Sequence, residues 1–559
     1  MSKWKHIALN CKIYLLSSPF NLLNRNLGIF SGNKNFWIDI KFNFKQFGLI
    51  CYSTRNSTMK YTLSLWILLN FTLLGAQNFD LPTLEWGPLL QQPIEAKMAG
   101  IIADEDYFYA WRYGKYARKG DEMYLEKYNE DGSLSLYRKL KMNPGEAFRK
   151  FFSWKGGKVA LVEGKEYVRL IAVNEESLAP GSEILYVKKE KDQYWQNVEV
   201  DATQGRLLIL LRERKGWQQR VRLRLIVLDQ NMEVCWDEDT QLPYVYAEYY
   251  PEKVLISSEG DVFITGYTQF AYERSVDKGK PNFQFIILSF TGFGKIQTEF
   301  QIGLRRKIVT DFQVNLNDEG KLVGIGFYSE NKEAAAGGVF LTTIDPYKQT
   351  ASGGKLHAFA KAYDMGRVRV GQQFEWNELS QNKGEFLHYY IRSFLPEPGG
   401  GGLLIAEQVI LQENYISFKE GYSANQINYN FNDLLLINLS AEGQVSWVKK
   451  IPKKQRTLND KGKYSSISAI PTAEDNYLIY NDNGKNFSKN NKTRTFKGLQ
   501  SVIALTHVDE NGKAESFPIA INEEQGVLFQ PGLTSSFGKD KKIIYGEKGK
   551  NFRFGILTF

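Results

Sequence analysis

Residues 254–267 read VLISSEGDVFITGY, and residues 285–300 read FIILSFTGFGKIQTEF. Each stretch holds two runs rich in Val, Ile, Leu and Phe, which are separated by a short polar turn containing Gly. Runs of this length and composition are typical of strands, and glycine supplies the positive φ that tight hairpins need. The sequence from 254 to 300 therefore predicts a unit of four antiparallel strands.

The same unit recurs along the chain. Its second hairpin is visible seven times, beginning at Met123, Tyr167, Leu223, Phe285, Val339, Leu434 and Val502. Two further strand candidates precede most of these hairpins, as they do at Val198, Phe312 and Ile467. Repeated four-stranded sheets have few ways to protect their edges, and radial closure into a β-propeller is the common one. We therefore expect an all-β propeller of four-stranded antiparallel blades over residues 80–559.

The two ends of the chain predict how the ring closes. Residues 533–559 supply three more strands, and the missing fourth strand is found in TLEWGPLL, which begins at Thr83. We expect eight blades, with the N- and C-terminal strands sharing the last one. Seven blades plus an insertion is the alternative, because residues 355–430 are about twice the usual unit and contain the Gly-rich turn at 398–402.

This arrangement resembles the secreted bacterial β-propeller repeat proteins over about residues 80–559. The resemblance lies in the repeat pattern alone. The Trp-Asp ending of WD40 blades, the paired glycines of kelch blades and the sialidase-type Asp box are not present as regular marks.

Residues 59–76 have the organisation of a secretory signal. Met59 and Lys60 precede an apolar stretch from Leu63 to Leu74, and small residues follow up to Ala76. The apolar stretch is shorter than the ~20 residues that a membrane span needs. We expect cleavage near Ala76, a secreted or periplasmic location, and no transmembrane span in the mature chain. Residues 1–58 are then either an over-extended start or a cytoplasmic extension to a signal anchor.

The positive charge of the chain is concentrated in this leader. The formal net charge is +9, and residues 1–60 carry nine Lys and Arg against a single acid, Asp39. The remainder has 62 basic and 61 acidic residues. A nearly neutral body removes the general electrostatic argument for nucleic acid as a partner.

Residues with reactive side chains are few. Cys235 is the sole cysteine after the leader, so an intramolecular disulfide is excluded there, and we expect it in the core. His357, His388 and His507 are far apart in strand-like runs, which argues against a metal site or a nucleophilic triad. No catalytic residue or cofactor is identified. The acidic turns at 129–132, 317–320 and 509–512 are interpreted as hairpin turns, not calcium loops.

Aromatic residues cluster in three places. The clusters are Tyr244, Tyr246, Tyr249 and Tyr250; Tyr194 and Trp195; and Trp376, Tyr389 and Tyr390. Aromatic faces bind sugar rings, but they also fill the wedges between blades. Core packing is the expected role of each.

The connections between the second and third strands are long and basic. They include residues 212–222, 267–283, 411–433 and 481–499, and over the eight units their charges sum to +8. Long loops on one face of a rigid scaffold are common binding sites. We expect contacts from basic residues of two loops, namely Arg212, Arg214, Lys215, Arg220, Lys485, Lys489, Lys492 and Arg494.

The expected function is therefore that of an exported binding protein, whose partner is an anionic glycan or a negatively charged envelope component. One alternative is an enzyme, either one that acts on glycans or a quinone-dependent dehydrogenase. A structural adaptor in an envelope complex is another. Paired carboxylates in a deep central pocket would favour the enzyme, and a shallow loop-rimmed face would favour binding.

Overall fold

The structure is a computed structural model, and it covers the body of the chain. It describes residues 82–92, 96–104, 106–114, 122–190, 193–201, 205–213, 216–269, 283–317, 319–330, 335–352, 355–359, 386–397, 401–417, 423–472, 475–488 and 493–559. The expected leader and signal segment lie outside these residues. Within them, no helix is long and apolar enough to cross a membrane.

Eight antiparallel sheets of four or five strands follow one another along the chain, and we number these blades in chain order. Blades 1 to 4 consist of β3 (Ala96–Ala103), β4 (Tyr107–Gly114), β5 (Glu122–Asn129) and β6 (Leu134–Lys141); β7 (Ala147–Trp154), β8 (Gly157–Glu163), β9 (Tyr167–Val173) and β10 (Pro180–Lys188); β11 (Gln193–Asp201), β12 (Arg206–Glu213), β13 (Arg220–Leu228) and β14 (Val234–Val245); and β15 (Tyr249–Ile256), β16 (Val262–Gln269), β17 (Phe283–Thr291) and β18 (Ile296–Ile302).

Blades 5 to 8 follow the same plan with added short strands. They consist of β19 (Ile308–Leu316), β20 (Leu322–Ser329), β22 (Gly338–Asp345), β23 (Thr350–Ala351) and β24 (Lys355–Ala358); β26 (Tyr389–Pro396), β27 (Gly402–Ser417), β28 (Ser423–Leu439), β29 (Val445–Ile451) and β30 (Gln455–Leu458); β31 (Ser468–Pro471), β32 (Asn476–Asp482), β33 (Val502–Val508) and β34 (Ala514–Ile521); and β35 (Leu528–Phe537), β36 (Lys541–Lys548), β37 (Asn551–Thr558), β1 (Thr83–Trp86) and β2 (Leu90–Gln91). A separate pair joins β21 (Ala335–Ala336) to β25 (Phe386–Leu387).

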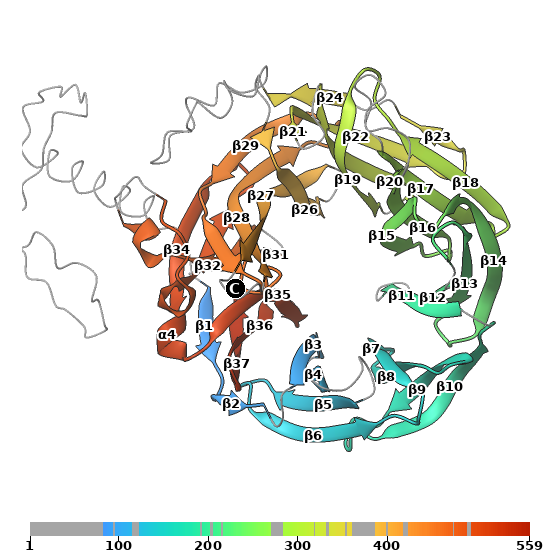
Figure 1. The fold of residues 1–559 in the computed structure, drawn as a ribbon, viewed down its shortest axis with the longest axis horizontal. Coiled ribbons are helices and arrows are strands. Elements are labelled where there is room, and N and C mark those ends of the chain that lie inside the picture. Colours follow the sequence, from blue (N-terminus) through green and yellow to red (C-terminus); the bar gives the residue numbers. More distant parts are fainter. Residues whose placement is uncertain are drawn as a thin grey trace, which may run out of the picture. The chain divides into compact units, whose positions relative to one another are not determined.

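The blades stand side by side in a ring, with the first strand of each blade nearest the centre (Figure 1). The all-β propeller and its count of eight blades are thus confirmed, and the alternative of seven blades is excluded. The first hairpin of each blade turns at one end of the ring. The connections between second and third strands lie at the other, which we call the loop-bearing end.

The terminal strands share blade 8 as expected. β1 pairs antiparallel with β37, and its register runs from Thr83 opposite Thr558 to Trp86 opposite Gly555. β37 in turn pairs with β36. Closure therefore depends on backbone hydrogen bonds between residues more than 450 positions apart in the chain.

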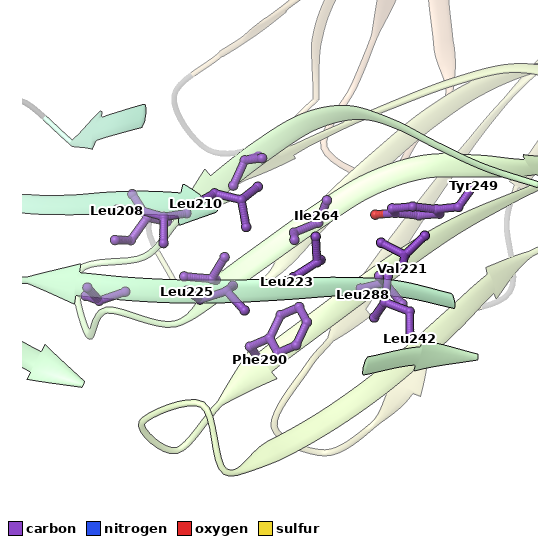
Figure 2. Packing of buried hydrophobic residues seen from close by; sticks show 14 of the residues in the cluster. Leu208, Leu210, Val221, Leu223, Leu225, Leu242, Tyr249, Ile264, Leu288 and Phe290 are labelled. Carbon is purple, nitrogen blue, oxygen red and sulfur yellow. The ribbon is translucent and has the colours of Figure 1, made fainter. Parts of the chain in front are cut away.

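The continuous apolar runs of the sequence are explained by packing on both faces of each blade. In β12, Leu207, Ile209 and Leu211 belong to the core between blades 2 and 3. Leu208 and Leu210 point the other way, into the core shared with blade 4 (Figure 2). Successive side chains of a strand point to opposite faces, so a sheet covered on both sides needs an unbroken apolar run.

The acidic turns are hairpin turns, as interpreted from sequence. Gly132, Gly320 and Gly512 all have positive φ, and each donates its N–H to the carbonyl of the turn's first residue. In the last turn the Asp509 carboxylate accepts from the N–H of Lys513 at 2.8 Å. These side chains are thus engaged in stabilising the turns.

One connection differs from the expectation. Residues 411–433 were predicted to be a loop, but they continue β27 and β28 as a paired hairpin out to Ser417 opposite Ser423. β30 then pairs with β28 at Asn428–Phe431. The prediction was wrong because Asn and Gln are frequent in this stretch, and the regular pairing of the two strands outweighs their weak strand propensity.

Candidate functional site

The innermost strands of blades 1 to 6 share a local irregularity. Each has a β-bulge near the loop-bearing end, seen as a one-residue shift in its pairing with the second strand. The extra residues are Ala99, Arg149, Gln196, Glu252, Thr310 and Arg392. A bulge re-aims side chains, and bulges are frequent beside functional sites.

A cavity of about 930 Å³ lies along the innermost strands of blades 4, 5 and 6. Two of the bulge residues, Glu252 and Arg392, line it. Asp311, which follows the bulge residue Thr310, also lines it. His388 and Leu411 also line it, so it reaches the loop-bearing end. The volume lies within the range of small-molecule sites.

Glu252 is the acid that is free in this cavity. Its pairing neighbours Pro251 and Lys253 flank it in the bulge, and no hydrogen bond or ion pair holds its carboxylate among the described residues. The cavity walls remove solvent from around it, and the nearby Asp311 adds a like charge. Together they raise the pKa of Glu252 to about 7.

Asp311, by contrast, is held rigidly between two blades. One carboxylate oxygen accepts the N–H of Phe312 at 2.8 Å, and the other accepts the N–H of Ile391 on β26 at 2.5 Å. Burial raises the pKa of Asp311 to about 6, although these hydrogen bonds oppose the shift. The pKa of Glu252 is therefore the higher of the two, and near neutral pH Glu252 is more often protonated than Asp311.

The side chain of Arg392, which lines the cavity, is held in place by the buried carboxylate of Glu407. Its Nε donates to Glu407 at 2.8 Å. Glu407 is fully buried and also accepts from Lys453 Nζ at 2.5 Å and from Ser466 Oγ at 2.6 Å. This network holds two cations, Arg392 and Lys453, and one carboxylate, so Glu407 compensates only one of the two positive charges.

The remaining polar side chains of the lining tie the three innermost strands together. Lys253 Nζ donates to Asn315 Oδ1 at 2.6 Å, and Gln313 Nε2 donates to the carbonyl of Ile391 at 3.2 Å. Tyr390 is 40% exposed, so its ring is accessible to a ligand. The cavity thus combines an aromatic face, amides, and one free acid.

The eight basic residues expected to bind a partner are only partly described. Arg214, Lys215, Lys489 and Lys492 lie outside the described residues. Arg212 and Arg220 belong to blade 3, whereas Lys485 and Arg494 belong to the loop of blade 7.

Within blade 7, the Asn486 side chain brings the two basic residues together. It binds the backbone N–H and C=O of Arg494 at 2.7 and 3.0 Å, and it directly follows Lys485. Blades 3 and 7 stand opposite each other in a ring of eight (Figure 1). The described basic residues therefore form two separate groups, one in blade 3 and one in blade 7.

Part of the predicted loop charge is neutralised by neighbouring strands. Arg222, which contributed to that charge, pairs with Asp239 at 2.7 Å and with Glu190 at 3.0 Å. The acids responsible lie outside the loops that were counted. A count of loop charges therefore overstates the basic character of this end.

Most aromatic residues of the described clusters pack as expected. Tyr246 and Tyr249 are buried, at 9% and 1% exposure. Tyr250 stacks on Tyr267 with ring centroids 5.0 Å apart, yet it remains 36% exposed. Trp376 and the side chains of Tyr194 and Trp195 lie outside the described part of the chain, so their expected packing stays a prediction.

The reactive residues are spread over several blades. His357 contacts the carbonyl of Gly443, and His507 pairs with Asp475. His388 differs from the expectation: it precedes β26 with a φ of 60° instead of lying in a strand. Cys235 is half-buried against the core between blades 3 and 4. Among the described residues, no group of three His, Cys, Asp or Glu side chains could hold a metal ion.

Sequence reasoning missed Glu252, Asp311 and Arg392. One signal was available for Glu252. Gly266 lies within a strand run, and a Cβ there would come within 2.3 Å of the Tyr250 carbonyl oxygen. A glycine inside a strand indicates a bulge or a close backbone approach.

Comparison with known proteins gives only distant likenesses. No protein-family model matches the chain, and no curated protein matches its sequence. Among solved structures, it is similar to the WD40 domain of SCAP from fission yeast, with 9% identity and a TM-score of 0.38 over 84% of this chain and 98% of that one. It is also similar to the Dos1 propeller, with 7% identity and a TM-score of 0.40 over 84% of this chain and 94% of that one. A third likeness is to puromycin hydrolase, with 12% identity and a TM-score of 0.34 over 83% of this chain and 61% of that one. Scores this low carry no argument about function.

Proposed function

We propose that the protein binds a glycan, and that sugar units of this glycan occupy the cavity between blades 4, 5 and 6. The observation that carries the proposal is the shared lining of this cavity by the accessible ring of Tyr390, the free carboxyl of Glu252 and the amides Gln313 and Asn315. A sugar offers an apolar face to an aromatic ring and hydroxyls to carboxyl and amide groups. Each part of this lining therefore has a counterpart in the ligand.

The expected anionic character of the partner and its location outside the cytoplasm belong to the same proposal. Arg212, Arg220, Lys485 and Arg494 belong to the connections at the loop-bearing end, which the cavity reaches. Export is supported by the signal-like residues 59–76.

Calorimetric titration of the purified protein with a panel of neutral and acidic oligosaccharides tests this proposal. Tyr390→Ala should weaken binding of the preferred oligosaccharide about tenfold, because the stacking surface is lost. Glu252→Gln tests the free carboxyl without changing the size of the side chain. Tyr186→Ala is the matched control, since Tyr186 is 52% exposed on the outermost strand of blade 2. Equal loss of binding in Tyr186→Ala and Tyr390→Ala would contradict the assignment of the cavity.

Glycoside hydrolysis is a second candidate, favoured by the two carboxyls. Hydrolysis needs one acid that is protonated and a second group that is ionised, and the raised pKa values of about 7 for Glu252 and about 6 for Asp311 provide this combination between those pH values. Glu252 would donate its proton to the glycosidic oxygen as that bond breaks. Water would add to the anomeric carbon and release its proton to Asp311.

Release of reducing ends from the oligosaccharides that bind tests this candidate. Turnover that is lost in Glu252→Gln while binding persists would support hydrolysis. Binding without any release of reducing ends would leave the protein a binding protein.

A further inference from the structure

The junction between blades 3 and 4 at the loop-bearing end is fixed by residues 217–219, which precede β13. The N–H of Tyr246 donates to the carbonyl of Gln219 at 3.1 Å, and the N–H of Ala247 donates to the carbonyl of Trp217 at 3.0 Å. Residues 217–219 therefore lie against the connection from β14 to β15. Trp217 is 72% exposed there, more than any other large apolar side chain among the described residues.

Two buried polar groups at this junction have no hydrogen-bond partner in the described part of the chain. They are Arg212 Nε and the hydroxyl of Tyr249. The Arg212 guanidinium lies 4.4 Å from the centre of the Tyr246 ring. Burial raises the pKa of the Tyr249 hydroxyl, and the charge of Arg212 opposes this rise, so the two groups lie within electrostatic reach.

Such groups are rarely left unpaired in folded proteins. Buried N–H and O–H groups almost always find an acceptor in the protein, in a ligand or in ordered water. A carboxylate can accept from both groups and also compensates the arginine charge. Glu299, an acid whose charge acts on Tyr249, accepts from Tyr244 Oη at 2.7 Å. The junction thus has an unmet requirement for a negatively charged acceptor.

The surroundings suit a sugar that carries this carboxylate. Trp217 offers an exposed aromatic face, and Arg220 is an exposed cation at the start of β13. Tyr249 is also the first residue of β15, three positions before Glu252, which corresponds to about 10 Å along the strand. One oligosaccharide could therefore extend from the junction into the cavity.

From these contacts we propose an acidic-sugar subsite made of Arg212, Trp217, Arg220 and Tyr249. It binds the carboxylate of a uronic acid unit, while neighbouring units occupy the cavity. This inference rests on the proposed function and specifies its substrate class. It also gives the basic residues of blade 3 a defined role, separate from those of blade 7.

Titration with short oligomers of galacturonic acid and with the matching neutral galactose oligomers tests the subsite. The protein should bind the acidic oligomer more tightly, and added salt should reduce this preference. Arg212→Gln and Tyr249→Phe should each weaken binding of the acidic oligomer about tenfold and leave binding of the neutral oligomer unchanged. Lys295→Gln, which removes a 74% exposed cation from the hairpin at the opposite end of the ring, is the matched control.

The stability of the variants separates a ligand site from an internal water site. If the Tyr249 hydroxyl awaits a ligand, Tyr249→Phe should melt at the same or a higher temperature without sugar. A lower melting temperature with unchanged acidic binding would show a bound water only and overturn the subsite. Equal affinity for both oligomers would also overturn it but leave the proposed function standing. If neither oligomer binds, the result counts against both the proposed function and the subsite. If Tyr390→Ala loses binding of the acidic and the neutral oligomer alike, the result supports the cavity alone.

Discussion

Trp86 lies directly opposite Gly555 in the strand pair that closes the ring. A Cβ added at Gly555 would lie 3.2 Å from Cδ2 of Trp86 and 3.0 Å from Cδ1 of Leu84. The N-terminal strand is therefore packed against the C-terminal strand as closely as a glycine allows. This contact joins the two ends of the described chain and supports the first prediction.

Closure of the ring should contribute strongly to stability. Deleting residues 552–559 removes most of β37, the strand that lies between β1 and β36. We expect the free energy of unfolding to fall by well over the ~1 kcal/mol of a typical point change, measured by denaturant titration. Gly555→Val should cost about 1–3 kcal/mol through crowding. Gly157→Val is its control, because the nearest atom to a Cβ there is 3.6 Å away. An unchanged unfolding curve after the deletion would argue against the shared blade.

The buried ion pair between Glu407 and Lys453 should be sensitive to loss of one partner. Both side chains are fully buried, and Lys453 Nζ also donates to the Phe431 carbonyl and to Gln455 Oε1. Lys453→Met should destabilise the protein by about 1–3 kcal/mol, because Glu407 keeps its ion pair with Arg392 but loses the bond from Lys453, and the Phe431 carbonyl and Gln455 Oε1 lose this donor.

The control for that change is Lys295→Met, which breaks the exposed pair with Glu238. Its cost should lie within about 1 kcal/mol. Similar unfolding midpoints for the two variants would show that the buried pair contributes no more to the free energy of unfolding than the exposed pair does.

The cavity acids should make stability depend on pH. The pKa values of Glu252 and Asp311 are raised to about 7 and about 6, so the folded protein binds more protons than the unfolded chain above about pH 4. Their contribution is complete below about pH 4 and is lost as the pH rises through 7. Glu252→Gln should therefore raise the melting temperature relative to wild type at pH 8 more than at pH 5. The exposed Glu176→Gln is the control, and a pH-independent difference in Glu252→Gln would contradict the raised pKa.

Asn522 connects blades 7 and 8 through buried hydrogen bonds. It is the first residue of the short helix α4 (Asn522–Gln525), and it accepts the N–H of Phe529 while its Nδ2 donates to the Ser501 carbonyl and to Asn481 Oδ1. Asn522→Ala should cost about 3 kcal/mol, because it leaves buried groups unpaired. The neighbouring Glu523→Ala should cost far less. Hydrogen exchange should show the Phe529 amide losing protection in Asn522→Ala alone.

The sequence was sufficient for the local parts of this fold. Hairpins such as the one after Met123 are defined by neighbours in the chain, through apolar runs and turns in which Gly132 adopts positive φ. The closing strand at Thr83 could be anticipated because an unpaired edge at residues 552–559 required a partner. The hairpin extension at 411–433 was missed, since its polar residues resemble those of a loop.

By itself, the sequence determined the all-β class and the closure of the ring by its terminal strands, because period, turn residues and edge pairing are read from neighbours along the chain. It left eight blades and seven blades with an insertion as alternatives, and the structure decided for eight. The tertiary structure alone decided which side chains share a site. Glu252, Asp311 and Arg392 come from three different blades, and one-residue bulges in their strands direct the backbone near them toward one cavity. It also separated the basic groups of blades 3 and 7. Proximity around a ring depends on the angle between blades, and no spacing within the chain encodes that angle.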